Sequence, residues 1–213
     1  MTRHRLAAVL AATAALVLAA CGISPDDQPR ALPVPPSTTT TAAPPTPGGS
    51  ASAVLWYVDD QSLVPASRAL TDRSLGTALG ALLEPGASLE GGLSNSIPAG
   101  TQLLELQLDA GVLGVDLSGS FQELAGTARQ LAIGQLVLTA TEDREVEEVR
   151  FLVDGEPVLA SSPERGDVAS VTACDFAPLL PSAEEAAAAQ LSSTTVERLD
   201  QRRSELERDC PSP

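Results

Sequence analysis

The sequence predicts an α+β fold, in which a small mixed sheet carries two helices on one face and a helical tail follows at the C-terminus. Apolar and polar residues alternate over 104–108, 113–117 and 145–153, as in strands with one face in water. Leucines and alanines recur at helical spacing over 72–83 and 120–139. The elements therefore run strand, helix, hairpin, helix, strand, an order that permits both helices on one face of the sheet.

The first two elements are a strand and a helix. Ala53–Val58 is rich in apolar and aromatic residues, which favours a strand. A helix is expected from about Asp72 to Leu83, with Thr71 or Asp72 as its N-cap and Glu84-Pro85-Gly86 as its end. Five residues give this helix one buried stripe, namely Leu75, Ala78, Leu79, Leu82 and Leu83.

A hairpin follows, with its turn at Asp109-Ala110-Gly111. Its first strand has leucines on one face and polar residues on the other, Leu104, Leu106 and Leu108 against Glu105 and Gln107. Its second strand alternates apolar residues at Leu113, Val115 and Leu117. One face of this hairpin is therefore expected in the core and the other in water.

The second half of the domain holds a longer helix and two strands. A wide apolar face predicts a helix from about Ser120 to Thr139. Glu145–Val153 alternates as a strand, Asp154-Gly155 makes a turn, and Pro157–Leu159 returns as a short strand. Residues 161–180 are expected to form the domain edge and a connector.

Residues 181–213 predict a helical tail. Val196, Leu199, Leu206 and Cys210 fall on one stripe that Arg203 completes, so Cys210 faces the same way as the apolar residues. An acidic, disordered tail is the alternative. We favour a helix docked on the domain and held there by a bond from Cys210.

Charge and missing residue types exclude several functions. The 213-residue chain has a net charge of −15, which disfavours binding of nucleic acid or an anionic lipid surface. The chain has no lysine, and its single histidine is His4 in the expected leader. Ser-His-Asp, Cys-His, Schiff-base and histidine-metal chemistry are therefore excluded from the exported chain. No cofactor motif is present, so we expect no enzyme, no catalytic residues, no metal and no cofactor.

The N-terminus has the three parts of an export signal, which are Arg3-His4-Arg5, an apolar run over 6–17, and Leu18-Ala19-Ala20 before Cys21. The last part resembles the lipobox of bacterial lipoproteins, which implies cleavage of residues 1–20 and a lipid on the Cys21 sulfur. A transmembrane helix is the alternative, but the apolar run of about 15 residues is shorter than the roughly 20 needed. We expect a chain anchored by lipid to the outer face of the cell membrane.

Residues 21–52 predict a linker, because eight prolines lie among serine, threonine and glycine. Such a segment stays solvated and could extend by about 90 Å. It would hold a folded domain, residues 53–160, away from the membrane.

Two cysteines are left once Cys21 is lipidated. Cys174 and Cys210 are an even pair in an oxidising compartment, which predicts a disulfide. Two free thiols are the alternative.

Six segments of the chain match, in order, the pattern of one known domain. Two of them are Leu93–Thr101, with the pattern Leu-x-x-x-Ile-Pro-x-Gly-Thr, and Gly111–Ser118, with the pattern Gly-Val-x-x-Val-Asp-Leu-Ser. The others are Trp56-Tyr57-Val58 with Leu63-Val64-Pro65 and Arg68, Ala78–Pro85, Gln135–Thr141 and Val149–Gly155. Together these segments resemble the GerMN domain of spore germination and sporulation proteins. The resemblance spans residues 53–160 in one copy. It implies a fold similar to ring-building motifs and an extracytoplasmic lipoprotein without catalytic residues, and the lack of lysine points to a high-GC bacterium.

Single residues in these segments have structural interpretations. Asp116 is expected to cap the second helix or bind loop amides, and Asp154 to form the Asp-Gly turn. Arg68 is expected to pair with a local carboxylate, and Trp56 or Tyr57 to lie in the core. Ligand contact is the alternative for Arg68, and glycan binding for the two aromatic residues.

Three functions compete. The first is a non-catalytic, membrane-anchored interaction domain that acts as adaptor or regulator of envelope proteins. The second is a module that binds peptidoglycan or another wall polymer, and the third is a carboxylate-based glycan hydrolase. Few aromatic residues and the negative charge argue against the second, and no spacing pairs two acids for the third. Nothing in the sequence supports self-association.

Overall fold

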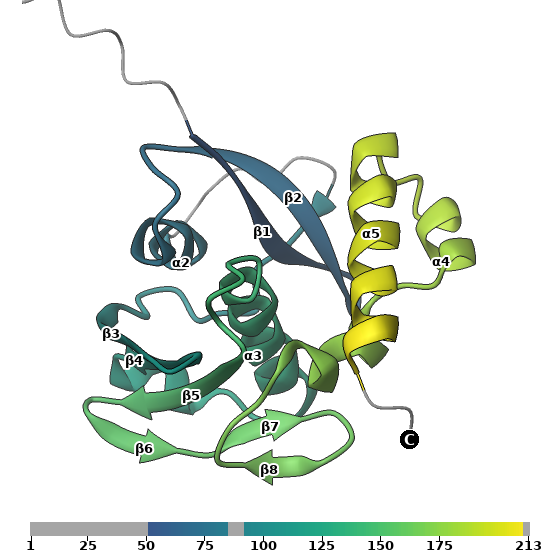
Figure 1. The fold of residues 1–213 in the computed structure, drawn as a ribbon. Coiled ribbons are helices and arrows are strands. Elements are labelled where there is room, and N and C mark those ends of the chain that lie inside the picture. The colour runs from purple at the N-terminus through teal and green to yellow at the C-terminus, as the bar shows by residue number, and fades with distance from the viewer. Residues whose placement is uncertain (1–50, 85–91, 211–213) are drawn as a thin grey trace, which may run out of the picture. The chain divides into compact units, whose positions relative to one another are not determined.

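The computed structural model describes residues 51–84 and 92–210 (Figure 1). The expected leader, Cys21 and the linker as far as residue 50 lie outside the described residues. All of these described residues belong to one compact unit. The α+β class is confirmed, with strands in three sheets and helices between and beside them.

A hairpin of two long strands opens the domain. β1 (Ala51–Asp59) pairs antiparallel with β2 (Ser62–Leu70), and Asp60 takes a positive φ of 56° in the turn between them. Residues 51 and 52 were expected in the linker, and no strand was predicted at β2, where Pro65 is an unfavourable residue for a strand. Pro65 is accommodated because its partner Trp56 makes its backbone hydrogen bonds elsewhere.

Those hydrogen bonds go to helix α3 (Gly126–Ala140). The Trp56 amide donates to Thr139 Oγ1 at 3.0 Å, and Gln135 Nε2 donates to the Trp56 carbonyl at 3.0 Å. Gln135 Oε1 also accepts from the Ser96 amide at 2.8 Å. Two buried polar side chains thus satisfy the Trp56 backbone at this edge of β1, and the Ser94 backbone pairs with Val58 beside them.

Helix α2 (Leu75–Leu83) is shorter than expected. Ser74, rather than Thr71 or Asp72, is the N-cap, because its Oγ accepts from the Thr77 amide at 3.2 Å. Asp72 instead accepts from the Ser74 amide at 2.8 Å. Hydrogen bonds from the side chain and the amide of Ser74 lower the pKa of Asp72 to about 2. Three residues that favour the N-cap position, Thr71, Asp72 and Ser74, lie within four positions here, so N-cap preference alone does not identify the one that caps the helix.

The main sheet is mixed, as predicted. Its strands lie in the order β3 (Leu103–Asp109), β4 (Val112–Leu117), β5 (Glu148–Val153) and β6 (Glu156–Val158). β4 and β5 are parallel, and the outer pairs are antiparallel. The predicted first strand is not part of this sheet, since β1 pairs with β2.

The leucine stripe of β3 is the clearest departure from the expected burial. Leu106 is half-buried, but Leu104 and Leu108 are exposed. β3 is an edge strand with a register shift between Leu103 and Glu105, so the residues alternate over only part of its length.

The second predicted helix is two elements. A 3₁₀ turn, η2 (Gly119–Glu123), precedes α3, which begins at Gly126 with a φ of 57°. α2 and α3 lie between the β1–β2 hairpin and the four-stranded sheet, as Figure 1 shows. The core is built from both helices and the inner faces of the strands.

Residues 160–179 hold structure that the sequence did not reveal. β7 (Ala160–Ser162) and β8 (Gly166–Val168) form a small hairpin, and η3 (Ala173–Leu179) follows. The C-terminal tail is helical, as predicted, but in two parts, α4 (Ala183–Ala188) and α5 (Ser193–Asp209). Gln190, with a φ of 55°, lies between the two helices.

Candidate functional site

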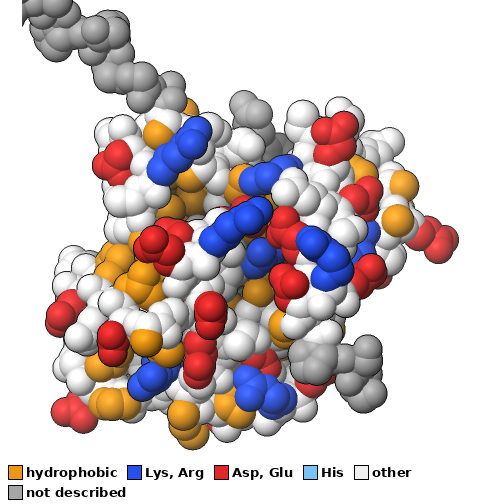
Figure 2. Space-filling view, in the orientation of Figure 1, with side chains coloured by type: hydrophobic (Ala, Val, Ile, Leu, Met, Phe, Trp, Pro, Cys, Tyr) orange, Lys and Arg blue, Asp and Glu red, His pale blue; other side chains and the backbone are white. Residues whose placement is uncertain are grey.

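A groove of about 1150 Å³ lies where α5 meets the β1–β2 hairpin, the loop after α3, and η3. Five arginines and six carboxylates line it, whereas acids outnumber arginines about two to one in the whole chain. Figure 2 shows arginine side chains gathered on this face between the hairpin and α5. The groove is therefore a mixed-charge surface on an acidic protein.

α5 packs along one wall of the groove through the apolar stripe read from the sequence. Leu199 and Leu206 are buried, and Val196 is half-buried. The helix contacts β2 and η3. Ser192 starts it by accepting the Thr195 amide at 3.2 Å, so both local capping and tertiary burial fix its position.

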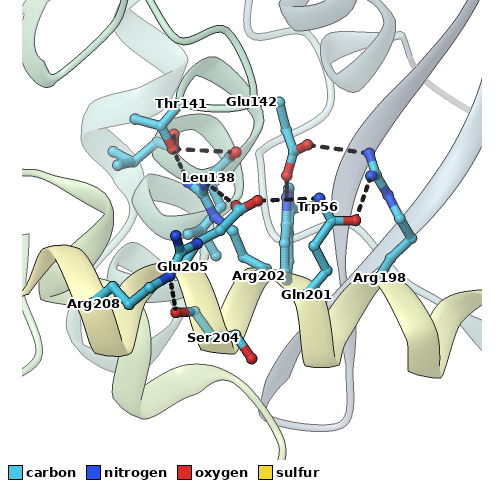
Figure 3. A network of polar contacts seen from close by, with 11 residues as sticks. Trp56, Leu138, Thr141, Glu142, Arg198, Gln201, Arg202, Ser204, Glu205 and Arg208 are labelled. Carbon is cyan, nitrogen blue, oxygen red and sulfur yellow. Dashed lines mark hydrogen bonds and ion pairs between the residues drawn. The ribbon is translucent and has the colours of Figure 1, made fainter.

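A polar network joins α5 to the domain (Figure 3). Trp56 Nε1 donates to Glu142 Oε1 at 3.1 Å, and Arg198 Nη2 donates to Glu142 Oε2 at 3.4 Å. Glu142 therefore bridges the buried indole of β1 and the arginine of α5. The ion pair is partly exposed, so it contributes less than about 1 kcal/mol and acts mainly to orient α5.

Arg202 is the most buried arginine of the network, with its side chain 12% exposed. Its Nη2 donates to Thr141 Oγ1 at 2.5 Å, and its Nη1 lies 3.4 Å from Glu205 Oε2. Its Nε is buried without a hydrogen-bond partner in the part of the chain that the structure describes. Thr141 itself donates back to the Val137 carbonyl at the end of α3, which couples this helix to α5.

The disulfide lies at one end of the groove. Cys174 of η3 and Cys210 at the C-cap of α5 are bonded, with their Cα atoms 5.6 Å apart and a sequence separation of 36. The bond holds the last turn of α5 against η3, on the side of the helix that the stripe of Leu199 and Leu206 predicts.

η3 is fixed in turn by an ion pair between the buried carboxylate of Asp175 and the half-exposed side chain of Arg165. Arg165 binds Asp175 with two hydrogen bonds, Nε–Oδ1 at 2.5 Å and Nη2–Oδ2 at 2.7 Å. Burial raises the pKa of Asp175, but hydrogen bonds from Arg165, the Thr172 amide and Ser162 outweigh it, so the net pKa lies below the usual 3.8. The carboxylate is ionised at neutral pH and cross-links the β7–β8 hairpin to η3.

The site offers hydrogen-bond donors and acceptors for a polar partner. Every aromatic residue of the chain is buried, so none provides a platform for stacking on sugar rings. Within residues 51–84 and 92–210, no cluster of three His, Cys, Asp or Glu side chains could hold a metal ion. In the same residues, no helix is long and apolar enough to cross a membrane.

The structure also places the other residues singled out in the sequence. Arg68 pairs with Glu84 at 3.1 Å and donates to the Ala81 carbonyl at 2.9 Å, a structural role. Asp116 accepts the Gly155 amide at 3.1 Å, and Asp154 has the positive φ of the Asp-Gly turn. Trp56 and Tyr57 are both in the core, where only one was expected.

Several residues of the site were missed. Glu142, Arg198 and Arg202 carried no motif, because their roles depend on the docking of α5. Arg165 and Asp175 were missed because the β7–β8 hairpin was not predicted. The ten-residue separation of Arg165 and Asp175 in the sequence does not itself indicate an ion pair.

Comparison with known proteins decides the family. Residues 47–159 match the family model Germane, which is described as sporulation and spore germination. The chain belongs to this family. The GerMN resemblance read from the sequence is thereby confirmed, and we refer to the matched segment as the Germane domain.

One solved structure shows the same fold at low identity, and two more are similar to this chain at lower TM-scores. The tandem GerMN domains of the sporulation protein GerM from Bacillus subtilis align with a TM-score of 0.51 and 18% identity, over 59% of this chain and 47% of theirs. The first GerMN domain of the same protein gives 0.47 and 20%, over 55% and 92%. A candidate lipoprotein from Clostridium perfringens gives 0.39 and 18%, over 62% and 94%. This chain thus spans about half the length of the tandem structure. No curated protein matches.

The Germane domain supplies only part of the groove. The matched segment ends at residue 159, so η3, α4, α5 and both bonded cysteines follow it. Trp56, Thr141 and Glu142 come from the Germane domain, and Arg198 and Arg202 come from the C-terminal segment. The groove is therefore a composite of the two.

Proposed function

We propose that the chain is a lipid-anchored, extracytoplasmic lipoprotein whose Germane domain acts as a non-catalytic interaction module in the cell envelope. Its role would be that of an adaptor or regulator of envelope proteins. The family description names a process and no reaction, in keeping with a binding role.

The disulfide is the observation that carries this proposal. Bonds of this kind persist in oxidising compartments, and Cys174 and Cys210 are bonded in a position that fixes the C-terminal helix. Export is also what the leader and Cys21 predict, since a short apolar run after Arg3 and Arg5 precedes small residues and a cysteine. The disulfide and the leader thus both support a location on the outer side of the cell membrane.

Binding is favoured over catalysis by the chemistry of the groove. Glu142 bridges Trp56 and Arg198, and Asp175 is held ionised by Arg165, so these carboxylates serve as structural acceptors. The buried aromatic residues argue against wall polymer as the ligand and against a glycan hydrolase. Polar side chains along an open groove suit contact with another protein.

Fractionation tests the anchor. The wild-type chain and Cys21→Ser are expressed in a bacterium with the lipoprotein pathway and labelled with an alkyne-bearing fatty acid. Wild type is expected to carry the label and to lie in the membrane fraction. Cys21→Ser is expected to carry no label. Cys174→Ser is the matched control, because it removes a cysteine and keeps the anchor. Equal labelling of all three chains would refute lipidation at Cys21.

Affinity capture tests the interaction. The wild-type chain is incubated in parallel with solubilised envelope proteins and with purified sacculi. The proposal predicts enrichment of a defined membrane protein. Retention on sacculi without any captured protein would instead make the chain a wall-binding module, and capture of neither would refute an interaction role.

A further inference from the structure

The open edge of the main sheet is an unassigned interaction surface. β3 is the first strand in the order β3-β4-β5-β6, and within the described residues no other strand pairs with its outer edge. Three large hydrophobic side chains of the described residues are exposed, and two of them, Leu104 at 48% and Leu108 at 38%, lie on β3. Figure 2 shows hydrophobic side chains at the surface close to where Figure 1 places α2 and β3.

The backbone of β3 is ready to bond a further strand. Ala110 and Gly111 both have positive φ, 47° and 84°, and form a two-residue turn that makes Asp109 and Val112 a hydrogen-bonded pair. Bonded and non-bonded pairs alternate along an antiparallel ladder. The N–H and C=O groups of Leu106 and Leu108 therefore point away from β4, towards the open edge.

The two faces of β3 differ in chemistry. Leu106 and Leu108 lie opposite the buried residues Val115 and Leu113, so they share the inner face. Leu106 lies close to α2, near Gly76, while Leu108 is left uncovered. Glu105, Gln107 and Asp109 lie on the outer face, and all three are exposed. β3 carries no basic residue.

A second copy of this chain fits that edge poorly in the register centred on Gln107. An antiparallel pair of β3 strands centred on Gln107 would place Glu105 of each opposite Asp109 of the other. Like charges directly opposite one another are destabilising. The charge pattern calls instead for basic side chains next to Glu105 and Asp109, and the leucines call for apolar side chains on the alternate positions.

We propose that β3 binds an extended segment of a partner protein in which basic and apolar residues alternate, added as a further strand to the sheet. This inference rests on the proposed function and names the kind of partner that the domain fits. Backbone hydrogen bonds at Leu106 and Leu108 would supply affinity, and the alternation of side chains would supply specificity.

Blocked seven-residue peptides test the proposal against the full chain by isothermal titration. The first peptide alternates Val and Lys, the second alternates Val and Glu, and the third is the Val-Lys peptide with N-methyl groups on alternate amides. Only the first is expected to bind with saturation. Equal binding of the N-methylated peptide would reduce the effect to charge attraction and overturn the proposal, as would no binding at all.

Two variants locate the binding. Leu108→Pro removes an edge donor while the ladder to β4 is kept, and Glu105→Lys/Asp109→Lys reverses the charge of the edge. Each is expected to weaken the Val-Lys peptide at least about tenfold. Glu197→Lys/Glu207→Lys makes the same charge change on exposed positions of α5 and is expected to have no such effect. Equal weakening by this control, or an unchanged affinity in both edge variants, would overturn the proposal.

Capture from envelope extract separates this inference from the proposed function. If wild type captures a membrane protein and the edge variants do not, both stand. If the edge variants capture it as well as wild type does, the edge proposal fails and the proposed function survives. Capture of nothing by wild type would count against the proposed function, whatever the peptides do. A dimer of the chain that the edge variants abolish would contradict the assignment of a basic partner.

Discussion

Removal of the disulfide is expected to destabilise the folded unit by about 3.8 kcal/mol. Cys174 and Cys210 lie 36 residues apart, and in the chain-entropy model a cross-link closing such a loop reduces the entropy of the unfolded chain by about 12.8 cal/mol/K. Multiplied by about 298 K, this gives the stated free energy. For a unit of this size the melting temperature should fall by about 10 °C.

The assay is urea unfolding of wild type and Cys174→Ala/Cys210→Ala, followed by the fluorescence of Trp56. Trp56 is the only tryptophan of the chain and is buried beside the Glu142–Arg198 bridge, so it reports on the region that α5 covers. Wild type treated with a thiol reductant is the matched control, and its midpoint should agree with that of the double variant.

Hydrogen exchange adds a local measurement to the same variant. Leu199 and Leu206 still bury α5 when the bond is absent, but its last turn loses its tether to η3. Amides near Cys210 should therefore exchange faster in the double variant, and those of α3 should keep their relative protection. A loss of less than about 1 kcal/mol, with α5 exchanging as in wild type, would refute the role of the disulfide as the clasp of this helix.

Three further predictions follow from the packing, the buried polar groups and the charges. Gly134→Ala should destabilise the fold by about 1–2 kcal/mol, because the added Cβ would lie 2.5 Å from Leu63 Cδ1 and 3.0 Å from the Phe176 ring. Gly80→Ala, whose Cβ would meet nothing within 4 Å, should instead stabilise the fold by about 0.5–1 kcal/mol. Thermal melts measure both variants, and equal effects would refute the packing argument. Gln135→Leu should lower the free energy of unfolding in urea by about 2–4 kcal/mol, since it leaves the Trp56 carbonyl and the Ser96 amide unpaired. The exposed control Gln122→Leu should change it by no more than about 0.5 kcal/mol. A Gln135→Leu variant as stable as wild type would contradict the role of Gln135 as partner of these backbone groups. The pKa of Asp175 in the folded state lies below its usual 3.8, so the stability that the carboxylate contributes is complete at neutral pH and is lost as the pH falls below about 3.8. Between about pH 7 and 2.5 the urea midpoint of wild type should therefore fall more steeply than that of Asp175→Asn. Parallel curves would refute the pairing of Asp175 with Arg165.

Much of the fold was predictable because local patterns and tertiary burial agree in the centre of the chain. β4, β5 and α2 each show a period that matches the face they bury. The same agreement allowed the stripe on α5 to place Cys210 on the side of η3. These elements are specified by their own residues and by one neighbouring layer.

The errors arise where a local rule met a tertiary exception. Pro65 in β2 is acceptable only because Thr139 and Gln135 satisfy Trp56, and no local pattern shows that pairing. The leucines of β3 alternate as if one face were covered, yet this edge strand leaves Leu104 and Leu108 exposed. That exception is also the observation from which a partner strand was inferred.

The polar groove could not be predicted for a related reason. Glu142 and Arg198 are 56 residues apart, and Trp56 is 86 residues before Glu142. Their contact depends on how α5 docks, which the disulfide and two leucines determine. Single charged residues on a predicted helix carry no information about such partners.

Photo-crosslinking in living cells tests the central claim most directly, because it requires both the anchor and the interaction. Wild type and Cys21→Ser would each carry a crosslinking residue in place of Gln107 on the exposed face of β3. The account predicts that wild type, in the membrane fraction, crosslinks to one defined envelope protein, and that Cys21→Ser leaves the membrane fraction with most of that product lost. Unchanged membrane association of Cys21→Ser, or the absence of any crosslinked protein in wild type, would contradict it.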